Sequence, residues 1–464
     1  MSKDKDIVII GCGASGGTAA QFARKTDRKA SITVIEQGKY PQYSKCGLPY
    51  AIAGVIPHFT DLIEFSEEWF AREHINLLLQ TTVEDIDHQN HCVIARRGTT
   101  TIKQSYDVLI LATGAKPWIP PIEQLRDHNQ KLLQGVFVVR TLDDAKQISS
   151  FAKKGKKATI VGAGLIGLEM ADCLYKKGMM VTVVEALPTI LANTLDADLT
   201  EPVLKKIKEH VSVLTNHLVI RAESKNGSIT GVVAKEKETT NETRIDTDVL
   251  IISTGCKPEI LLAKKLGCLI GEKGGILVNN RTETSIPDVY AVGDCTQYVD
   301  FVTNQPILVG LGSIGVRQGI TAGINAAGGD YQLPKGLLQT CTSEFFGVEI
   351  AAVGPPSNKI TDISMISGKF TGSSLPSYFP GGEPITIKVI SQAETGRILA
   401  AQAVGSNAAQ RINTFACAIL NEMTVENLRK LETAYAPPIA PTLDAVTLAC
   451  DVVALKMNRR QRSP

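Results

Sequence analysis

A run of apolar residues, a glycine-rich turn, a helical stretch and a second apolar run occur together twice along this chain. The first copy reads "DIVIIGCGASGGTAAQFARK" and continues into "SITVIEQ", and the second reads "KATIVGAGLIGLEMADCLYKKG" and continues into "MVTVVEA". Short runs of consecutive apolar residues are typical of strands buried on both faces, as in parallel sheets covered by helices. Each copy therefore predicts a βαβ unit, and the fold class is α/β.

Further apolar runs that lead into glycine lie at residues 107–117, 248–258 and 284–295. The alternating, polar stretch "SITGVVAKEKETTNETRIDTD" predicts a β-hairpin after the second unit. Beyond residue 330 strand patterns mix with the helical stretch "NAAQRINTFACAILNEMT", which predicts a separate α+β domain. We expect a discontinuous first domain (1–115 and 248–330), a second domain (116–247) and a third domain (331–464).

Composition narrows the possible partners. The chain has 464 residues, 49 Lys and Arg against 47 Asp and Glu, and a net charge of +2, so no basic field for nucleic acid is expected. The ten cysteines are scattered without a CxxC pair, and the seven histidines show no ligand spacing, so neither a metal site nor a disulfide framework is predicted. We expect most of the cysteines to be small buried residues.

The start of the chain, "MSKDKDIVII", is charged and lacks the pattern of an export signal. No apolar run approaches the ~18 residues of a membrane span. We therefore expect a cytoplasmic protein without a membrane partner.

The glycines of the two turns have the spacing of a nucleotide-binding motif. Gly11 and Gly162 permit the tight turn, and Gly13 and Gly164 let the backbone approach a pyrophosphate. The third glycine of each copy, Gly16 or Gly167, lets the helix pack closely on the strand. The N-terminus of each helix then presents unpaired N–H groups to the phosphates.

An acidic residue ends the second strand of each unit, where a carboxylate can accept hydrogen bonds from ribose hydroxyls. Glu36 follows the third glycine by 20 positions and Glu185 follows its own by 18. The segment "ALPT" after Glu185 supplies no Arg or Lys for a 2′-phosphate, so NADH is favoured over NADPH. A basic residue that arrives from elsewhere in the fold would reverse this preference.

The order of these motifs resembles the FAD-dependent pyridine nucleotide–disulfide oxidoreductases over essentially the whole chain. The resemblance implies two Rossmann-like domains, which bind FAD and NAD(P)H, and a C-terminal domain that forms a homodimer. The cofactor-binding residues that it implies are Gly11, Gly13, Ala14, Ser15, Gly16, Glu36, Gln37, Ser44, Lys45, Val83, Ala112, Thr113, Gly114, Gly162, Gly164, Leu165, Ile166, Gly167, Glu169, Glu185, Thr254, Gly255, Gly293, Asp294, Gly312 and Ser313.

One cysteine, Cys46 in "QYSKCGLPYA", lies where larger family members carry Cys-x4-Cys. The positions five residues away are Pro41 and Ala51, so no local disulfide partner exists. "SKCGLPY" resembles the single-cysteine branch of coenzyme A disulfide reductases, NADH oxidases and persulfide reductases. The segments at 308–329, 377–389 and 435–446 support that branch.

The resemblance implies transfer of electrons from NADH through FAD to a disulfide or persulfide on Cys46, with a coenzyme A derivative as the expected acceptor. A thiol without a partner can cycle through a mixed disulfide or through a sulfenic acid. The second cycle defines the alternative, an NADH oxidase that makes hydrogen peroxide or water. Ala14 stands where water-forming oxidases carry histidine, which favours sulfur substrates. A non-catalytic flavin electron-transfer subunit is the third possibility.

The remaining site residues also follow from the resemblance. Tyr435 and Tyr378 are expected to reach the site from the partner subunit as hydrogen-bond donors or acids. Lys25 and Arg317 are candidates for binding the phosphates of coenzyme A, although a solvated helix face is the commoner place for such residues. The chain ends at "MNRRQRSP" soon after the third domain. We therefore expect no rhodanese-like extension and no sulfur relay within one polypeptide.

Overall fold

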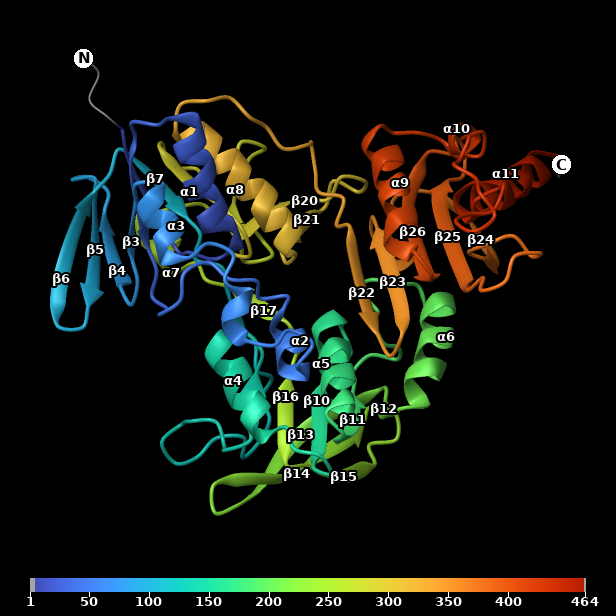
Figure 1. The fold of residues 1–464 in the computed structure, drawn as a ribbon, viewed down its shortest axis with the longest axis horizontal. Coiled ribbons are helices and arrows are strands. Elements are labelled where there is room, and N and C mark those ends of the chain that lie inside the picture. The colour runs from blue at the N-terminus through green and yellow to red at the C-terminus, as the bar shows by residue number, and fades with distance from the viewer. Residues whose placement is uncertain (1–4, 463–464) are drawn as a thin grey trace.

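The computed structural model describes residues 5–462 and contains three sheet-based parts (Figure 1). The strands of the first sheet pair in parallel, and its central strands are buried on both faces, as their runs of apolar residues predict. Its strand order is β19 (Val289–Ala291), β7 (Val108–Leu111), β1 (Asp6–Ile10), β2 (Ser31–Ile35) and β3 (Ile75–Leu78). The helices and small antiparallel sheet around it are α1 (Ala14–Thr26), α3 (Glu67–Arg72), α7 (Leu261–Leu266), α8 (Gly312–Ala326), β4 (Thr82–Asp87), β5 (Cys92–Arg97) and β6 (Thr100–Ser105).

Helices α1 and α8 approach each other closely in this first part. A Cβ atom built on Gly319 would lie 2.4 Å from the carbonyl oxygen of Ser15, and one on Gly323 would lie 2.4 Å from that of Ala19. Only glycine permits the two helices to pack this closely. Their packing places the N-terminal ends of both helices near the carboxyl ends of the strands.

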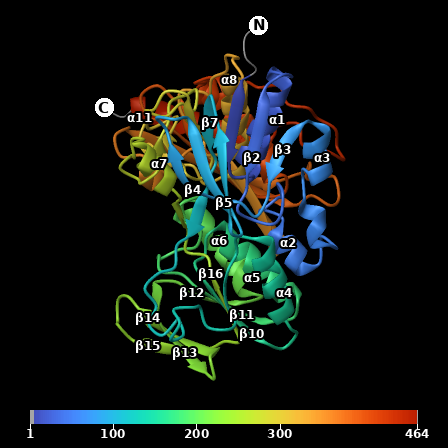
Figure 2. The ribbon, with the colours of Figure 1, turned by 90° about the vertical axis from the view of Figure 1, so that its left-hand side faces the viewer.

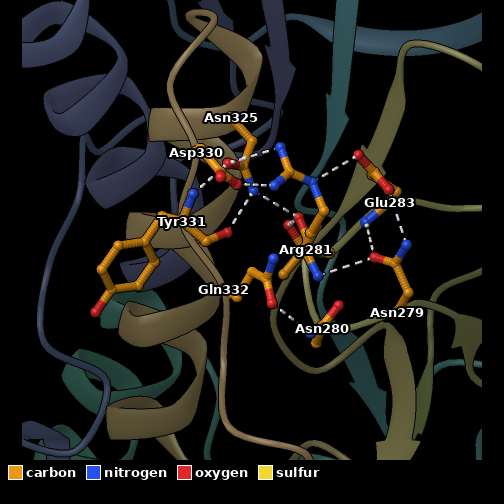
Figure 3. Close-up of polar contacts among 9 residues, drawn as sticks. Asn279, Asn280, Arg281, Glu283, Asn325, Asp330, Tyr331 and Gln332 are labelled. Carbon is orange, nitrogen blue, oxygen red and sulfur yellow. Dashed lines mark hydrogen bonds and ion pairs between the residues drawn. The ribbon is translucent and has the colours of Figure 1, made fainter.

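A polar cluster ties the C-terminal end of α8 to the loop before β19 (Figure 3). Arg281 donates to Glu283 at 3.1 Å and to Asn325 of α8 at 3.3 Å, and it forms an ion pair with Asp330. These contacts lie outside the large cavity described below, so we interpret them as structural.

The second sheet is also parallel and repeats the first. Its order is β12 (Ser212–Leu214), β11 (Met180–Val184), β10 (Lys157–Val161), β16 (Val249–Ile252) and β9 (Val136–Val138). Its other elements are α4 (Leu142–Phe151), α5 (Leu165–Lys176), α6 (Ala197–Lys208) and the antiparallel strands β13 (His217–Lys225), β14 (Ser228–Glu236) and β15 (Glu242–Asp246). The predicted hairpin is β14 and β15.

The domain boundary predicted at residue 248 is wrong by one strand. β16 pairs in parallel with β10, so it belongs to the second sheet. The error arises because "DVLIISTG" repeats "DVLILATG", and each segment supplies the corresponding strand of its own sheet. The chain passes between the two parts through β8 (Ala115–Pro117) and β17 (Cys256–Pro258), which pair antiparallel.

The third part is an antiparallel sheet with helices, as predicted for an α+β domain. The strand order is β22 (Cys341–Phe345), β23 (Val348–Val353), β26 (Ile398–Gly405), β25 (Pro384–Gln392) and β24 (Met365–Ser373). Its helices are α9 (Ala408–Leu420), α10 (Val425–Leu428) and α11 (Ala445–Arg462). The short strands β18 (Ile276–Leu277), β20 (Thr296–Val299) and β21 (Pro306–Leu308) form a small sheet of their own and precede α8 in sequence. Short 3₁₀ turns occur at Phe59–Leu62 and Ser357–Lys359.

The third part is joined to the second at two places. Lys388 of β25 forms an ion pair with Asp196 before α6 at 2.8 Å, and both side chains are largely buried. The tip of the β22–β23 hairpin carries Phe346, whose ring stacks on that of His210 with centroids 5.4 Å apart. These contacts fix the hairpin along α5 (Figure 1).

The first part also reaches into the second. The turned view in Figure 2 shows α2 (Leu48–Ala53) beside α4 and α5. Leu48 and Ile52 belong to the same buried cluster as Leu168 of α5, and Lys177 donates to the carbonyl of Ile52 at 3.0 Å. The segment directly before α2, which carries Cys46, is therefore anchored between the two parallel sheets. Among residues 5–462 no helix is long and apolar enough to cross a membrane.

Candidate active site

A continuous cavity of about 2650 Å³ runs past both glycine turns and reaches the third part of the molecule. The turns lie at the carboxyl ends of β1 and β10, where parallel α/β sheets bind their ligands. The wall on the side of the third part includes residues of β22 and α9.

The first glycine turn has the shape that its sequence predicts. Gly11 has a φ of +104°, and a Cβ atom there would lie 2.3 Å from the carbonyl oxygen of Ala112. A Cβ atom on Gly16 would lie 2.0 Å from the carbonyl oxygen of Gly11, so α1 packs directly on the turn. A Cβ atom on Gly13 would meet no protein atom within 4 Å, which leaves that face of the backbone open to the cavity.

The second turn repeats this geometry. Gly162 has a φ of +101°, and a Cβ atom on Gly167 would lie 2.0 Å from the carbonyl oxygen of Gly162. The corresponding atom on Gly164 would again meet nothing within 4 Å. Each turn thus leaves a cradle that a side chain would fill, at a helix N-terminus that favours anions.

The two strand-end acids are held in matching positions. Glu36 accepts hydrogen bonds from the N–H groups of Cys12 at 2.7 Å and Gly38 at 2.6 Å. Glu185 makes the same pair of contacts around the second turn, at 2.6 and 2.8 Å. Both carboxylates line the cavity. These features fit two dinucleotides, one at each turn, with ribose hydroxyls at the acids.

Cys46 faces the cavity between these two turns. Its thiol lies beside the start of α8, because a Cβ atom on Gly312 would come within 3.8 Å of the sulfur. Although Cys46 is exposed to the cavity, desolvation by the surrounding walls raises the pKa of its thiol, the charges of Glu169 and Asp294 raise it further, and Lys45 opposes them. The thiolate therefore depends on the charges around the cavity.

An ion pair beside the thiol has no motif in the sequence. Arg140, in the loop after β9, pairs with Asp294 at 3.1 Å, and both side chains line the cavity. The side chain of Lys45 is exposed to the cavity, but desolvation by the surrounding walls lowers its pKa, and the positive charge of Arg140 contributes to this shift. The sequence pattern predicts Asp294 but carries no signal for Arg140, which a loop brings from more than 150 positions away.

Glu169 of α5 contacts the third part of the molecule. Its carboxylate accepts a hydrogen bond from the hydroxyl of Ser343 on β22 at 2.6 Å, and both residues line the cavity. Burial raises the pKa of this carboxyl, and the Ser343 hydrogen bond lowers it in part. Ser343 is a second residue that the sequence pattern did not predict.

All ten cysteines lie in the described part of the chain, and all are free. Five are buried, so the expectation that most of them are buried holds for only half. Cys256 and Cys417 are exposed, and both line the cavity together with Cys46. They come from β17 and α9, whose spacing in the sequence gives no sign that they line one cavity.

The structure brings most of the predicted site residues to this cavity. The lining includes Gly11, Gly13, Ala14, Ser15, Glu36, Gln37, Ser44, Lys45, Cys46, Val83, Ala112, Thr113, Gly114, Gly162, Gly164, Leu165, Ile166, Glu169, Glu185, Thr254, Gly255, Gly293, Asp294, Gly312, Ser313 and Arg317. Gly16 and Gly167 lie behind it, where they pack helix on strand.

Three further predicted residues lie outside the cavity. Lys25 is in the last turn of α1, with its ammonium 4.7 Å from the centre of the Phe22 ring. Eleven residues of helix, or ~17 Å, separate it from the glycine turn. Tyr378 and Tyr435 form a hydrogen bond of 2.6 Å on the surface of the third part, with 69% and 47% of their areas exposed. Their predicted roles stay predictions.

Comparison with known proteins defines the class. Residues 5–311 match the family of pyridine nucleotide-disulphide oxidoreductases, and residues 340–446 match its dimerisation domain. The chain belongs to this oxidoreductase family, which confirms the resemblance and the predicted fold class. It is 37% identical over 464 residues to a Methanocaldococcus jannaschii protein named NADH oxidase, covering 98% of this chain and 99% of that protein.

Two further relatives carry names that refer to sulfur. A Pyrococcus abyssi protein named NAD(P)H sulfur oxidoreductase (CoA-dependent) is 32% identical, and the match covers 97% of this chain and 98% of that protein. The solved structure of an NAD-dependent persulfide reductase from A. fulgidus matches with a TM-score of 0.92 and 32% identity. That match covers 98% of this chain and 84% of the other.

Proposed function

We propose that this protein passes electrons from NADH, through FAD, to a disulfide or persulfide held on Cys46, and that a coenzyme A derivative is the acceptor. One observation carries the proposal: an exposed thiol faces the cavity between two dinucleotide cradles and is not bonded to another cysteine. FAD would lie at the turn that begins at Gly11 and NADH at the turn that begins at Gly162. When bound, FAD supplies two-electron transfer from the nicotinamide to sulfur.

Cys46 carries the sulfur chemistry in this proposal. Its thiolate attacks one sulfur of the acceptor, which forms a mixed disulfide and releases the other half as a thiolate. The two electrons from one NADH then break the mixed disulfide, which restores the Cys46 thiolate and releases the second thiolate. Lys45 and the start of α8 favour the thiolate, and Glu169 and Asp294 oppose it.

The phosphates of coenzyme A need cations, and Arg317 on α8 supplies one at the cavity wall. Lys25 would contact only a ligand that extends over the outer surface of α1. In a homodimer formed through the third part, Tyr378 and Tyr435 of one subunit would serve the other. Their exposure in the single chain is consistent with that role. The cytoplasmic location stays a prediction.

NADH oxidation by oxygen is the second candidate, and the name of the Methanocaldococcus jannaschii relative favours it. In that reaction Cys46 would pass through a sulfenic acid instead of a mixed disulfide. A non-catalytic flavin electron-transfer subunit would need no thiol at this position.

The test is NADH consumption by the purified holoenzyme under argon with coenzyme A disulfide or coenzyme A persulfide, against consumption in air without a sulfur acceptor. We expect faster consumption with the sulfur compounds and its loss in Cys46→Ser. Reduction of ferricyanide by NADH serves as the control, because that reaction needs no protein thiol. Equal sulfur-dependent rates in wild type and Cys46→Ser would refute the proposal, and turnover with oxygen alone would favour the oxidase.

A further inference from the structure

The cavity also passes the end of β11, beyond the second glycine turn, where the ribose of the adenosine is expected. Glu185 ends β11 there, and its two carboxylate oxygens accept from the N–H groups of Ala163 at 2.6 Å and Leu187 at 2.8 Å. Glu185, Ala186, Leu187 and His217 all line this part of the cavity.

A lysine from a distant loop, which is not itself a lining residue, contacts the backbone of Ala186 at this place. Lys237 directly follows β14, and its N–H donates to the carbonyl of Asn216 at 2.8 Å. Asn216, in the left-handed conformation with φ of 58°, donates in turn to the carbonyl of Leu187 at 3.0 Å. The ammonium of Lys237 then donates to the carbonyl of Ala186 at 3.2 Å. The chain thus holds this cation one residue from the ribose-binding acid.

This position bears on the choice between the two nicotinamide dinucleotides, which differ by a phosphate on the 2′ oxygen of the adenosine ribose. The segment after Glu185 has no cation of its own, and the carboxylate repels a phosphate. Both oxygens of Glu185 are already engaged by backbone N–H groups, which disperses part of its charge. Lys237 brings a full positive charge to the carbonyl of Ala186, from 51 positions further along the chain.

We propose that Lys237 determines cofactor specificity by pairing with a phosphate on the adenosine ribose, so that this site takes NADPH as well as NADH. The inference rests on the proposed function, because it assigns the second glycine turn to the nicotinamide dinucleotide. It goes beyond that function by naming the residue that selects the phosphorylated form.

The test is calorimetric titration of the oxidised holoenzyme with NADP⁺ and with NAD⁺, for wild type, Lys237→Met and Lys237→Arg. A hydrogen bond between a cation and a phosphate predicts a roughly 10-fold loss of NADP⁺ affinity in Lys237→Met. In the same variant NAD⁺ affinity should change less than about 2-fold, because NAD⁺ has no 2′-phosphate for Lys237 to pair with. Lys237→Arg keeps the positive charge and should retain NADP⁺ binding. Salt should weaken NADP⁺ binding more in wild type than in Lys237→Met.

A matched control and a simpler probe complete the design. Lys225→Met removes an exposed lysine from the far end of the same three-stranded sheet and should alter neither affinity. Neither adenosine 2′,5′-bisphosphate nor AMP contains a nicotinamide. Lys237→Met should weaken binding of adenosine 2′,5′-bisphosphate, which carries the 2′-phosphate, and should leave binding of AMP unchanged. Equal changes for NADP⁺ and NAD⁺ in Lys237→Met, no change for either, or a wild type that binds NADP⁺ over ~1000-fold more weakly than NAD⁺ would each overturn the inference. A wild type that binds neither dinucleotide would instead refute the proposed function.

Discussion

The variants Gly164→Ala and Gly167→Ala each add one methyl group to the second glycine turn. They test two different roles, because we expect Gly164 to let a ligand approach the backbone and Gly167 to let α5 pack on the turn. A Cβ atom on Gly164 meets no protein atom within 4 Å, and this residue has an ordinary φ of −78°. A Cβ atom on Gly167 would lie 2.0 Å from the carbonyl oxygen of Gly162 and 2.8 Å from the hydroxyl oxygen of Ser253.

The distances set the size of each effect. Carbon and carbonyl oxygen need more than 3.0 Å, so Gly167→Ala forces α5 and the turn apart by about 1 Å. Overpacking of this kind costs about 1–3 kcal/mol of stability. Gly164→Ala should leave stability unchanged or slightly raised, because alanine restricts the unfolded chain. Its methyl group would occupy the approach of the pyrophosphate, and the loss of charged hydrogen bonds predicts ~10–100-fold weaker NADH binding.

Thermal unfolding and calorimetric NAD⁺ titration measure the two effects separately. We expect Gly164→Ala to keep the wild-type unfolding temperature and to bind NAD⁺ more weakly. Gly167→Ala should bind NAD⁺ more weakly and should also unfold at a temperature ~2–10 °C lower. Flavin absorbance should be unchanged in both variants, since the first turn is intact. Wild-type affinity in Gly164→Ala, or equal destabilisation of the two variants, would refute this account of the turn.

Three further variants test the charges described above. Glu169→Gln should lower the pH at which Cys46 forms its thiolate, because the carboxylate raises the thiol pKa, and Lys45→Met should raise that pH. The rate of alkylation of Cys46 by iodoacetamide, measured against pH, reports both shifts. A shift of the opposite sign in either variant would contradict the site electrostatics. Lys388→Met should cost about 3 kcal/mol near pH 7, because it leaves Asp196 buried without its partner. Burial raises the pKa of Asp196, but Lys388 together with the Ser357 N–H and Gln402 lowers it overall in the folded state. The contribution of these contacts is therefore present above pH ~4 and is lost as pH falls through the folded-state pKa. Urea unfolding at several pH values checks this, and an undiminished difference at low pH would count against it.

Local patterns were enough to predict both glycine turns and their acids. The steric demands at Gly11 and Gly16 come from residues within one βαβ unit, and such units carry their own signature in the sequence. Cys46 was also accessible from sequence, because the absence of a nearby partner is itself a local feature.

The missed features depend on contacts between distant segments. Arg140 and Ser343 reach the cavity from a loop and from the third part, and no short motif encodes either approach. Lys237, which we propose as the partner of a 2′-phosphate, is a further case, since a hairpin brings it to Ala186 from 51 positions away. Lys25 is the opposite case. It is close to the first turn in sequence, but the rise of the helix carries it away.

The most direct test of the central claim is the intact mass of the protein after incubation with coenzyme A disulfide, with and without dithiothreitol, followed by peptide mapping. We predict one coenzyme A adduct per chain, located on Cys46, removed by the reductant and absent from Cys46→Ser. Cys256 and Cys417 are exposed in the same cavity and serve as internal controls. An adduct on either of those residues, or no adduct at Cys46, would contradict the account.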